Sequence, residues 1–192
     1  MAITINDIRL SYCNLFQPKA PMNNPTGEPK YSVTLLIPKT NKAALEAIQK
    51  AINEAVDAGV QSKWSGVRPP QPAVPIHDGD GVRPSDGMPF GEECKGMMVM
   101  AASSKQAPFV VDRQVQPIID PTQVYSGMWA NVSITLFPYL NAGKKGVGCG
   151  LNGVQKVRDD TPFGSRVTAQ EAFSAMPDEA PAVNLLNIFG LG

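Results

Sequence analysis

Three aromatic residues and two lysines in the last third of the chain have the types and spacing that suit nucleic-acid chemistry. Trp129, Phe137 and Tyr139 fall at positions of the same parity, and Lys144 and Lys145 follow in the next turn. Aromatic rings stack on the bases of single-stranded nucleic acid, and lysines contact its phosphates. The pattern therefore predicts a surface that binds single-stranded nucleic acid.

A β-strand must position these rings, because successive side chains of an extended chain point to opposite faces. One face of the expected strand is a core face, with Met128, Ala130, Val132, Ile134 and Leu136. The other face carries Trp129, Asn131, Ser133, Thr135, Phe137 and Tyr139. Aromatics on a solvent-facing sheet indicate binding, although a second small core under the helix or under a long loop would also explain them.

Other basic and aromatic residues are candidates for the same surface. The expected phosphate contacts are Lys144, Lys145, Lys156, Arg158 and Arg113, and further stacking groups from the loops are Tyr12, Phe16 and Trp64. Backbone contacts of this kind would add a salt-dependent term to binding. For Lys144 and Lys145 alone, an ordinary solvated turn is the alternative interpretation.

The formal net charge of zero hides an asymmetry along the chain. Residues 1–168 hold all 17 Lys and Arg against 14 acids, whereas residues 169–192 hold Glu171, Asp178 and Glu179 and no base. The segment 169–192 is therefore expected to be a flexible acidic and apolar tail. Such a tail either packs on the domain or binds replication or recombination proteins and competes with DNA for the basic surface.

Short strands, one helix and long loops rich in glycine and proline predict a mostly β fold. Strands are expected at 2–11, 31–38, 95–104, 109–111 and 125–156, the last as a hairpin. Residues 12–30 and 61–94 are expected to be loops. A helix capped by Thr40 or Asn41 should end at Gly59. The pattern favours a small antiparallel barrel or sandwich formed by residues 1–168.

The chain offers little for catalysis, metals or cofactors, and no cofactor is expected. Asp78 and Asp80 begin like a calcium loop, but the twelfth position from Asp78 is a proline, so the ligand register fails. A metal-dependent nuclease that uses Asp78 and Asp80 remains an alternative function. With one histidine, His77, no two-histidine metal site can form. The run GVGCGLNG lacks dinucleotide-loop spacing.

Four blocks of the sequence resemble one family. KYSVTLLIPK, HDGDGVRP, APFVVDRQVQPIIDPTQVYSGMWANVSITLFPY and KKGVGCGLNGVQKVRDDTPFG occur in that order and cover nearly all of residues 1–173. They are similar to the Enc34-like family of phage and prophage single-stranded DNA-binding proteins, long catalogued as a domain of unknown function. The family assigns no residue roles, so the candidates above stand on the strand pattern.

The resemblance implies an OB-fold, here a five-stranded antiparallel barrel, that binds single-stranded DNA with little sequence preference during phage replication or recombination. A non-enzymatic protein is expected, and the lack of a signal-peptide pattern in MAITINDIRL predicts a location in the host-cell cytoplasm. The expected helix follows the second clear strand, whereas the usual OB-fold helix follows the third. A structural OB-like module of the phage without nucleic-acid binding is the alternative.

Overall fold

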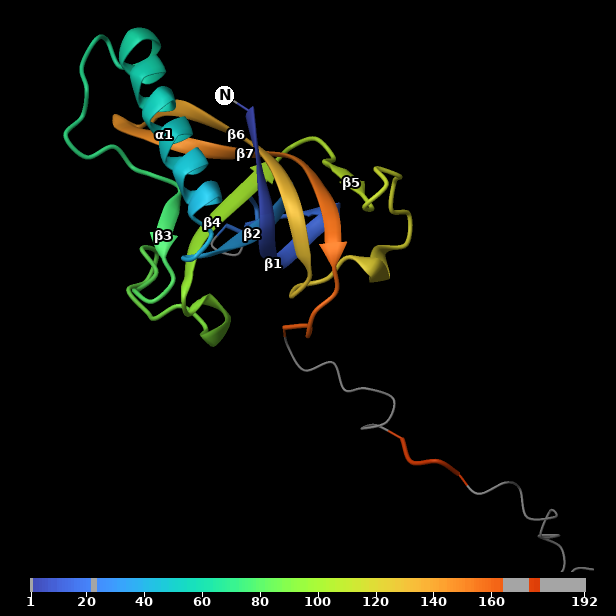
Figure 1. Cartoon of the computed structure of the whole chain (residues 1–192). Coiled ribbons are helices and arrows are strands. Elements are labelled where there is room, and N and C mark those ends of the chain that lie inside the picture. The colour runs from blue at the N-terminus through green and yellow to red at the C-terminus, as the bar shows by residue number, and fades with distance from the viewer. Residues whose placement is uncertain (1, 22–23, 164–172, 177–192) are drawn as a thin grey trace, which may run out of the picture.

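The computed structural model describes residues 2–21, 24–163 and 173–176 (Figure 1). Its strands are β1 (Ala2–Lys19), β2 (Lys30–Pro38), β3 (Ile76–Asp78), β4 (Met97–Ser104), β5 (Phe109–Val111), β6 (Trp129–Asn141) and β7 (Lys144–Arg158). One long helix, α1 (Lys42–Ser62), and two short 3₁₀ turns, Glu92–Cys94 and Pro121–Gln123, complete these elements. The expected tail, residues 169–192, lies outside the described residues apart from 173–176.

Five of the strands close into a barrel, as the sequence predicts. β4, β2, β1, β6 and β7 are hydrogen-bonded neighbours in this order, all antiparallel. A parallel contact between Ser103 of β4 and Gly150 of β7 joins the two ends of this row. β3 pairs with β4, and β5 pairs with β7, so the short strands extend the barrel wall. The mostly β, OB-like architecture is therefore confirmed.

The predicted division of β6 into two faces is confirmed at its apolar side. Ala130, Val132, Ile134 and Leu136 are buried in the main core, together with Met128 just before the strand. The apolar face of α1 joins the same cluster, and α1 packs against β1, β6 and β7. Because burial of each large aliphatic side chain stabilises a fold by about 1.5–3 kcal/mol, this continuous core holds the barrel together.

The helix begins where the sequence predicts and ends later. The side chain of Asn41 accepts a hydrogen bond from the backbone N–H of Ala44 at 3.2 Å, which caps the first turn. Gly59 does not end the helix, which continues to Ser62; it packs beneath Trp64, where a Cβ would lie 2.8 Å from the indole. The helix lies between the second and third barrel strands, since residues 2–19 form one strand.

Strand β1 is longer than predicted, and this changes the position of Tyr12. The expected loop at residues 12–30 begins only after Lys19. Positive φ angles of 60° at Asp7 and 48° at Tyr12 accompany register shifts in the pairing of β1 with its neighbours. Such bulges interrupt the alternation by which a strand is recognised in a sequence. Tyr12 therefore stands on a strand of the barrel, rather than in a loop.

The segment expected to be a long loop, residues 61–94, is anchored in two places. The backbone of Ala73 hydrogen-bonds to Lys145 and Val147 at the start of β7. Farther along, β3 pairs with β4, and residues 79–94 fold back over the outside of β4, where Cys94 contacts Leu36 and Val99 in a second, small core. No helix in the described part of the chain is long and apolar enough to span a membrane.

Candidate nucleic-acid interface

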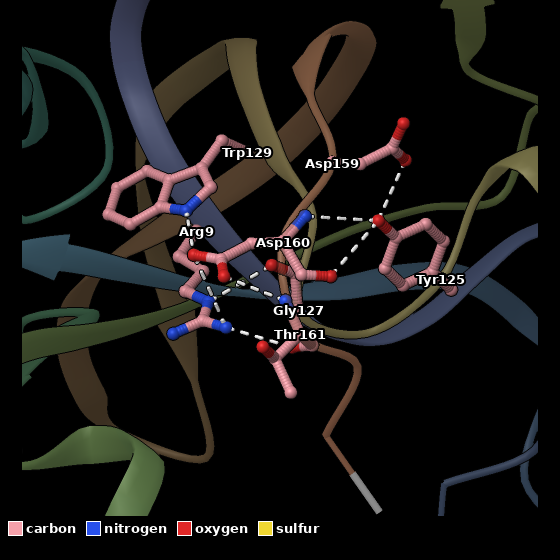
Figure 2. Close-up of polar contacts among 7 residues, drawn as sticks. All are labelled: Arg9, Tyr125, Gly127, Trp129, Asp159, Asp160 and Thr161. Atoms are coloured by element: carbon pink, nitrogen blue, oxygen red, sulfur yellow. Dashed lines mark hydrogen bonds and ion pairs between the residues drawn. The ribbon is translucent and has the colours of Figure 1, made fainter. Parts of the chain in front are cut away.

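Trp129, the first predicted stacking residue, lies in a polar cluster at the start of β6 (Figure 2). Its indole N–H donates to Asp160 Oδ2 at 2.8 Å, and the guanidinium of Arg158 lies 4.5 Å from its ring centroid. Arg9 of β1 approaches the same ring at 5.8 Å and forms an ion pair with Asp160 at 3.5 Å. A base could stack on the Arg158 side of this indole only by displacing Arg158.

The chain that follows β7 is fixed across the outside of the barrel by the same cluster. Arg9 donates from Nε to Gly127 O at 3.0 Å and from Nη2 to Thr161 O at 2.9 Å. The ring of Phe163 lies 4.3 Å from the Arg9 guanidinium and also packs against the small core. The clamp is our name for the following group: Arg9, Tyr125, Gly127, Trp129, Lys156, Arg158, Asp159, Asp160, Thr161 and Phe163.

The predicted phosphate ligands Lys156 and Arg158 are both engaged within the clamp. Lys156 Nζ donates to Gln123 O at 2.7 Å and pairs with Asp159 at 2.7 Å, while Arg158 pairs with Asp7 of β1. Asp159 also accepts a hydrogen bond from the Tyr125 hydroxyl at 2.7 Å. Donation from Lys156 and Tyr125 holds the pKa of Asp159 below its ordinary value. These cations already have anionic partners.

Phe137 and Tyr139 lie in a different environment, over a row of glycines on β7. Phe137 is opposite Gly148 and Tyr139 is opposite Gly146, and a Cβ at either glycine would lie within 2.6 Å of the facing ring. An aromatic ring that covers a cross-strand glycine is a known way to stabilise a sheet. Phe137 nevertheless remains 42% exposed, so its outer face is free for a ligand.

The remaining predicted residues are dispersed. Lys144 and Lys145 begin β7 after a turn in which Ala142 and Gly143 both have positive φ. Strand β7 spans 15 residues, so these lysines and Arg158 lie at opposite ends of the strand. Arg113 is exposed beyond β5. The predicted residues therefore do not form one patch.

One of the predicted stacking groups, Trp64, is a core residue, and another, Phe16, is partly buried. Trp64 is only 1% exposed, and its indole N–H donates to Tyr139 O at 3.0 Å, so it anchors the start of the 61–94 segment on β6. Phe16 is partly buried and packs against the main core. Tertiary packing, which a single sequence does not reveal, covers Trp64, so this ring cannot stack on a base; Phe16 is covered only in part and stays a prediction.

The structure contains a groove that the sequence pattern did not single out. It has a volume of about 510 Å³ and follows the outer face of β2 toward the ends of β1 and β4. Its floor consists of small polar side chains, Ser32 and Thr34 of β2 and Ser103 of β4. The alternation of residues in β2 is the sequence feature that identifies this outer face. Val33 and Leu35 point into the core, so the small residues between them point outward. We call this feature the β2–β4 groove.

One aromatic side chain and three basic ones line the β2–β4 groove, and two of these three cations are unpaired among the residues that the structure describes, unlike those of the clamp; the third, Arg83, pairs with Asp86. Tyr12 is 64% exposed beside it. Lys19 and Lys30, which face each other across β1 and β2, line it and form no ion pair within the described residues. Arg83 reaches the groove from the 61–94 segment. An exposed ring beside unpaired cations can stack on a base and contact phosphates.

The alternative metal site at Asp78 and Asp80 is occupied by a lysine. Lys39 Nζ lies 2.7 Å from Asp78 Oδ1 and 2.6 Å from Asp80 Oδ2. Hydrogen bonding to Lys39 holds the pKa of both carboxyl groups below the ordinary value. Among the residues that the structure describes, no cluster of three or more His, Cys, Asp or Glu side chains could hold a metal ion. This geometry does not support the nuclease hypothesis.

A closed OB-like barrel with a basic groove and one exposed tyrosine on its outer wall is the architecture of a small β-barrel binding protein. Residues 1–183 match the family described as "Enterobacter phage Enc34, ssDNA-binding protein", and this chain belongs to that family. The predicted family membership is thereby confirmed.

Three relatives give the extent of the similarity. The single-stranded DNA-binding protein of bacteriophage Enc34, solved in complex with ssDNA, is 31% identical, with a TM-score of 0.67 over 85% of this chain and 89% of that one. Putative protein p50 of Acyrthosiphon pisum secondary endosymbiont phage 1 is 29% identical over 90% of this chain and 92% of its own length. The single-stranded DNA-binding protein gp2.5 of bacteriophage T7, at 18% identity and a TM-score of 0.54 over 87% of this chain and 97% of that one, shares the fold.

Proposed function

We propose that this protein binds single-stranded DNA with little sequence preference and protects it in the host cytoplasm during phage DNA replication or recombination. The observation that carries the proposal is the exposed ring of Tyr12 beside Lys19 and Lys30 in the β2–β4 groove. Family membership and the Enc34 protein solved in complex with ssDNA support the same ligand.

The shape of the β2–β4 groove supports binding without base selection along most of its length. Its floor of serine and threonine side chains allows a strand to approach the sheet closely. Stacking on Tyr12 would contribute about 1–3 kcal/mol per base, and it tolerates any base because every base has a π-face. Lys19 and Lys30 would contact phosphates, which carry no sequence information.

Part of the predicted β6–β7 surface can extend this path. The contact of Ser103 with Gly150 brings the groove to the row of glycines on β7. A Cβ at Gly150 would lie 3.7 Å from Phe137, so this half-exposed ring lies next to the seam. We therefore place Phe137 in the path as a second stacking group, with Tyr139, Lys144 and Lys145 farther along the hairpin.

No catalytic step is assigned to the proposed activity. Stacking and phosphate contacts are binding interactions, and they need neither a nucleophile nor a metal ion. Partner proteins would be recruited through residues 169–192, most of which lie outside the described residues. This recruitment remains an expectation from the acidic and apolar sequence of the tail.

Fluorescence anisotropy of a labelled oligo(dT) tests the proposal. An oligonucleotide of about 16 nucleotides covers the upper end of the footprint of an OB-fold. We expect saturable binding at low salt, with an affinity that falls as salt rises, and weaker binding to the matched duplex. An RNA of the same length, tested in parallel, measures the preference for DNA. Absence of binding at low salt would overturn the proposal.

A further inference from the structure

A second cavity opens from the β2–β4 groove beside the 79–94 segment. It has a volume of about 290 Å³ and shares Tyr12, Thr34 and Arg83 with the groove as lining residues. Its base is apolar, because Val99 and Cys94 belong to the small core outside β4. A strand that follows the groove would therefore pass the mouth of this cavity, which we call the side pocket.

The lining of the side pocket combines two aromatic rings with a few polar groups. Tyr12 of β1 and Phe90 of the 79–94 segment supply the rings, and His77, Arg83 and Glu93 supply the polar atoms. An apolar cavity with a small number of polar side chains is typical of a site that fixes one small ligand in one orientation. Unstacked bases of single strands are recognised in this way, by stacking and by their polar edges.

Arg83 is held in position at the junction of the side pocket and the groove. Its Nε and Nη2 donate to the two carboxylate oxygens of Asp86, at 3.2 and 2.7 Å. The carboxylate of Asp86 is itself fixed by the backbone N–H of Met88, and its pKa lies below the ordinary value. This pair uses one edge of the guanidinium, so Nη1 is left to donate to a ligand.

Glu93 is the residue that selects among possible ligands. It lines the side pocket and forms no ion pair among the described residues, whereas its neighbour Glu92 pairs with Lys95 at 2.9 Å. A carboxylate repels the phosphates of DNA, so its place in such a site is favourable only if it accepts hydrogen bonds from a base. Guanine presents two adjacent donors, N1–H and N2–H₂, to the two oxygens of a carboxylate, and its O6 can accept from Arg83.

We propose that the side pocket takes one base turned out of the bound strand and prefers guanine. Tyr12 and Phe90 contact the faces or edges of the base, Glu93 accepts from N1–H and N2–H₂, and Arg83 donates to O6. This inference rests on the proposed function, because it assigns a base-selective position within an otherwise non-selective DNA path.

Single substitutions within oligo(dT) test the proposal on the intact protein. One central thymidine is replaced by deoxyguanosine, or by deoxyinosine, which keeps N1–H and O6 but lacks the exocyclic amino group. We expect the guanine-containing oligomer to bind about fivefold or more tightly than oligo(dT), as bidentate base contacts allow, and the inosine-containing oligomer to bind with intermediate affinity. The protein can shift its register, so the position of the substitution is not critical.

Two adjacent glutamates provide a matched pair of variants. Glu93→Gln keeps only one of the two acceptors and loses the charge, so it should reduce the guanine preference and retain binding to oligo(dT). Glu92→Gln removes the same charge one residue away, outside the side pocket, and should leave the preference unchanged. If Glu93→Gln does not fold, as judged by circular dichroism, the inosine comparison on the unmodified protein decides the question.

The outcomes separate this inference from the proposed function. Equal affinity for the guanine, inosine and thymine oligomers overturns the side-pocket proposal and leaves the proposed function standing. A guanine preference that is undiminished in Glu93→Gln also overturns the assignment. If no oligomer binds at low salt, the proposed function fails and the side-pocket proposal fails with it.

Discussion

The clamp and the β2–β4 groove contain the same kinds of residue, but the cations are all paired in the clamp, whereas in the groove only Arg83 is paired among the described residues. In the clamp, Arg9, Lys156 and Arg158 each have a carboxylate partner, and the indole of Trp129 carries a guanidinium on one face. In the groove, Lys19 and Lys30 have no such partner within the described part of the chain, and Tyr12 is 64% exposed.

The difference teaches that aromatic and basic composition alone does not identify a nucleic-acid site. What matters is whether these groups are already satisfied within the protein, since a cation that a carboxylate neutralises attracts a phosphate less strongly than an unpaired one. We therefore assign the clamp to stability and the groove to binding. Substitutions in the two regions should separate these properties.

Arg9→Ala should have the largest effect, and the effect should be on stability. The substitution removes the donors to Gly127 O and Thr161 O from a side chain that is only 19% exposed. Hydrogen bonds of charged groups contribute about 1.5–3 kcal/mol, so we expect a loss of this size in the free energy of unfolding. Urea denaturation measures it, with Lys30→Ala as the control that should not change stability.

Tyr12→Ala should reduce the affinity for oligo(dT) and leave the fold intact. Loss of one stacking platform corresponds to about 1–3 kcal/mol of binding free energy. Tyr12→Phe keeps the ring and should bind almost as tightly as the unmodified protein. Anisotropy titrations of both variants measure the difference. Equal affinities for Tyr12→Ala and the unmodified protein would remove Tyr12 from the site.

Replacement of Lys19 and Lys30 by glutamine should change the salt dependence of binding. Each phosphate contact to a single strand contributes about 0.7 to the slope of log affinity against log salt, so the double variant should have a slope shallower by about 1.4. The corresponding variant in the clamp, Lys156→Gln with Arg158→Gln, should keep the original slope. The reverse result would move the binding site to the clamp.

Acid should loosen the clamp with a small effect on global stability. Donation from Trp129, and then the backbone N–H of Thr161 and the charges of Arg9 and Arg158, hold the pKa of Asp160 below its ordinary value of 3.8. The stabilisation from Asp160 is therefore fully present at pH values above 3.8, the pKa of this carboxyl group in the unfolded chain. It is lost as the pH falls through the lower pKa that the group has in the folded protein. The indole N–H signal of Trp129, followed by nuclear magnetic resonance, should shift only in this range. A shift near neutral pH would contradict the assignment.

Regular patterning made the framework of this fold predictable from the sequence. Alternation over residues 128–136 gave the inner face of β6, and Asn41 gave the start of α1. Irregularities account for most of the failures. The bulge at Tyr12 hid the second half of β1, and Gly59, which looks like a helix end in the sequence, instead provides room for Trp64 within the helix.

The candidate site was less predictable than the fold, because it depends on partners that are distant in the sequence. Asp160 lies 31 residues from Trp129, and no local pattern connects the two. The groove joins residues of β1, β2, β4 and the 61–94 segment, which only the barrel brings together. Phe137, by contrast, was identifiable from alternation, and the glycines opposite it on β7 explain how its ring is supported.

Photocrosslinking tests most directly whether the groove, rather than the clamp, contacts DNA. Oligo(dT) that contains 5-iododeoxyuridine is irradiated in complex with the protein, and the crosslinked residue is identified by mass spectrometry. Both regions contain an aromatic residue that can react, Tyr12 in the groove and Trp129 in the clamp. We expect crosslinks at Tyr12. Crosslinks at Trp129, with none at Tyr12, would contradict the assignment of the groove as the binding site.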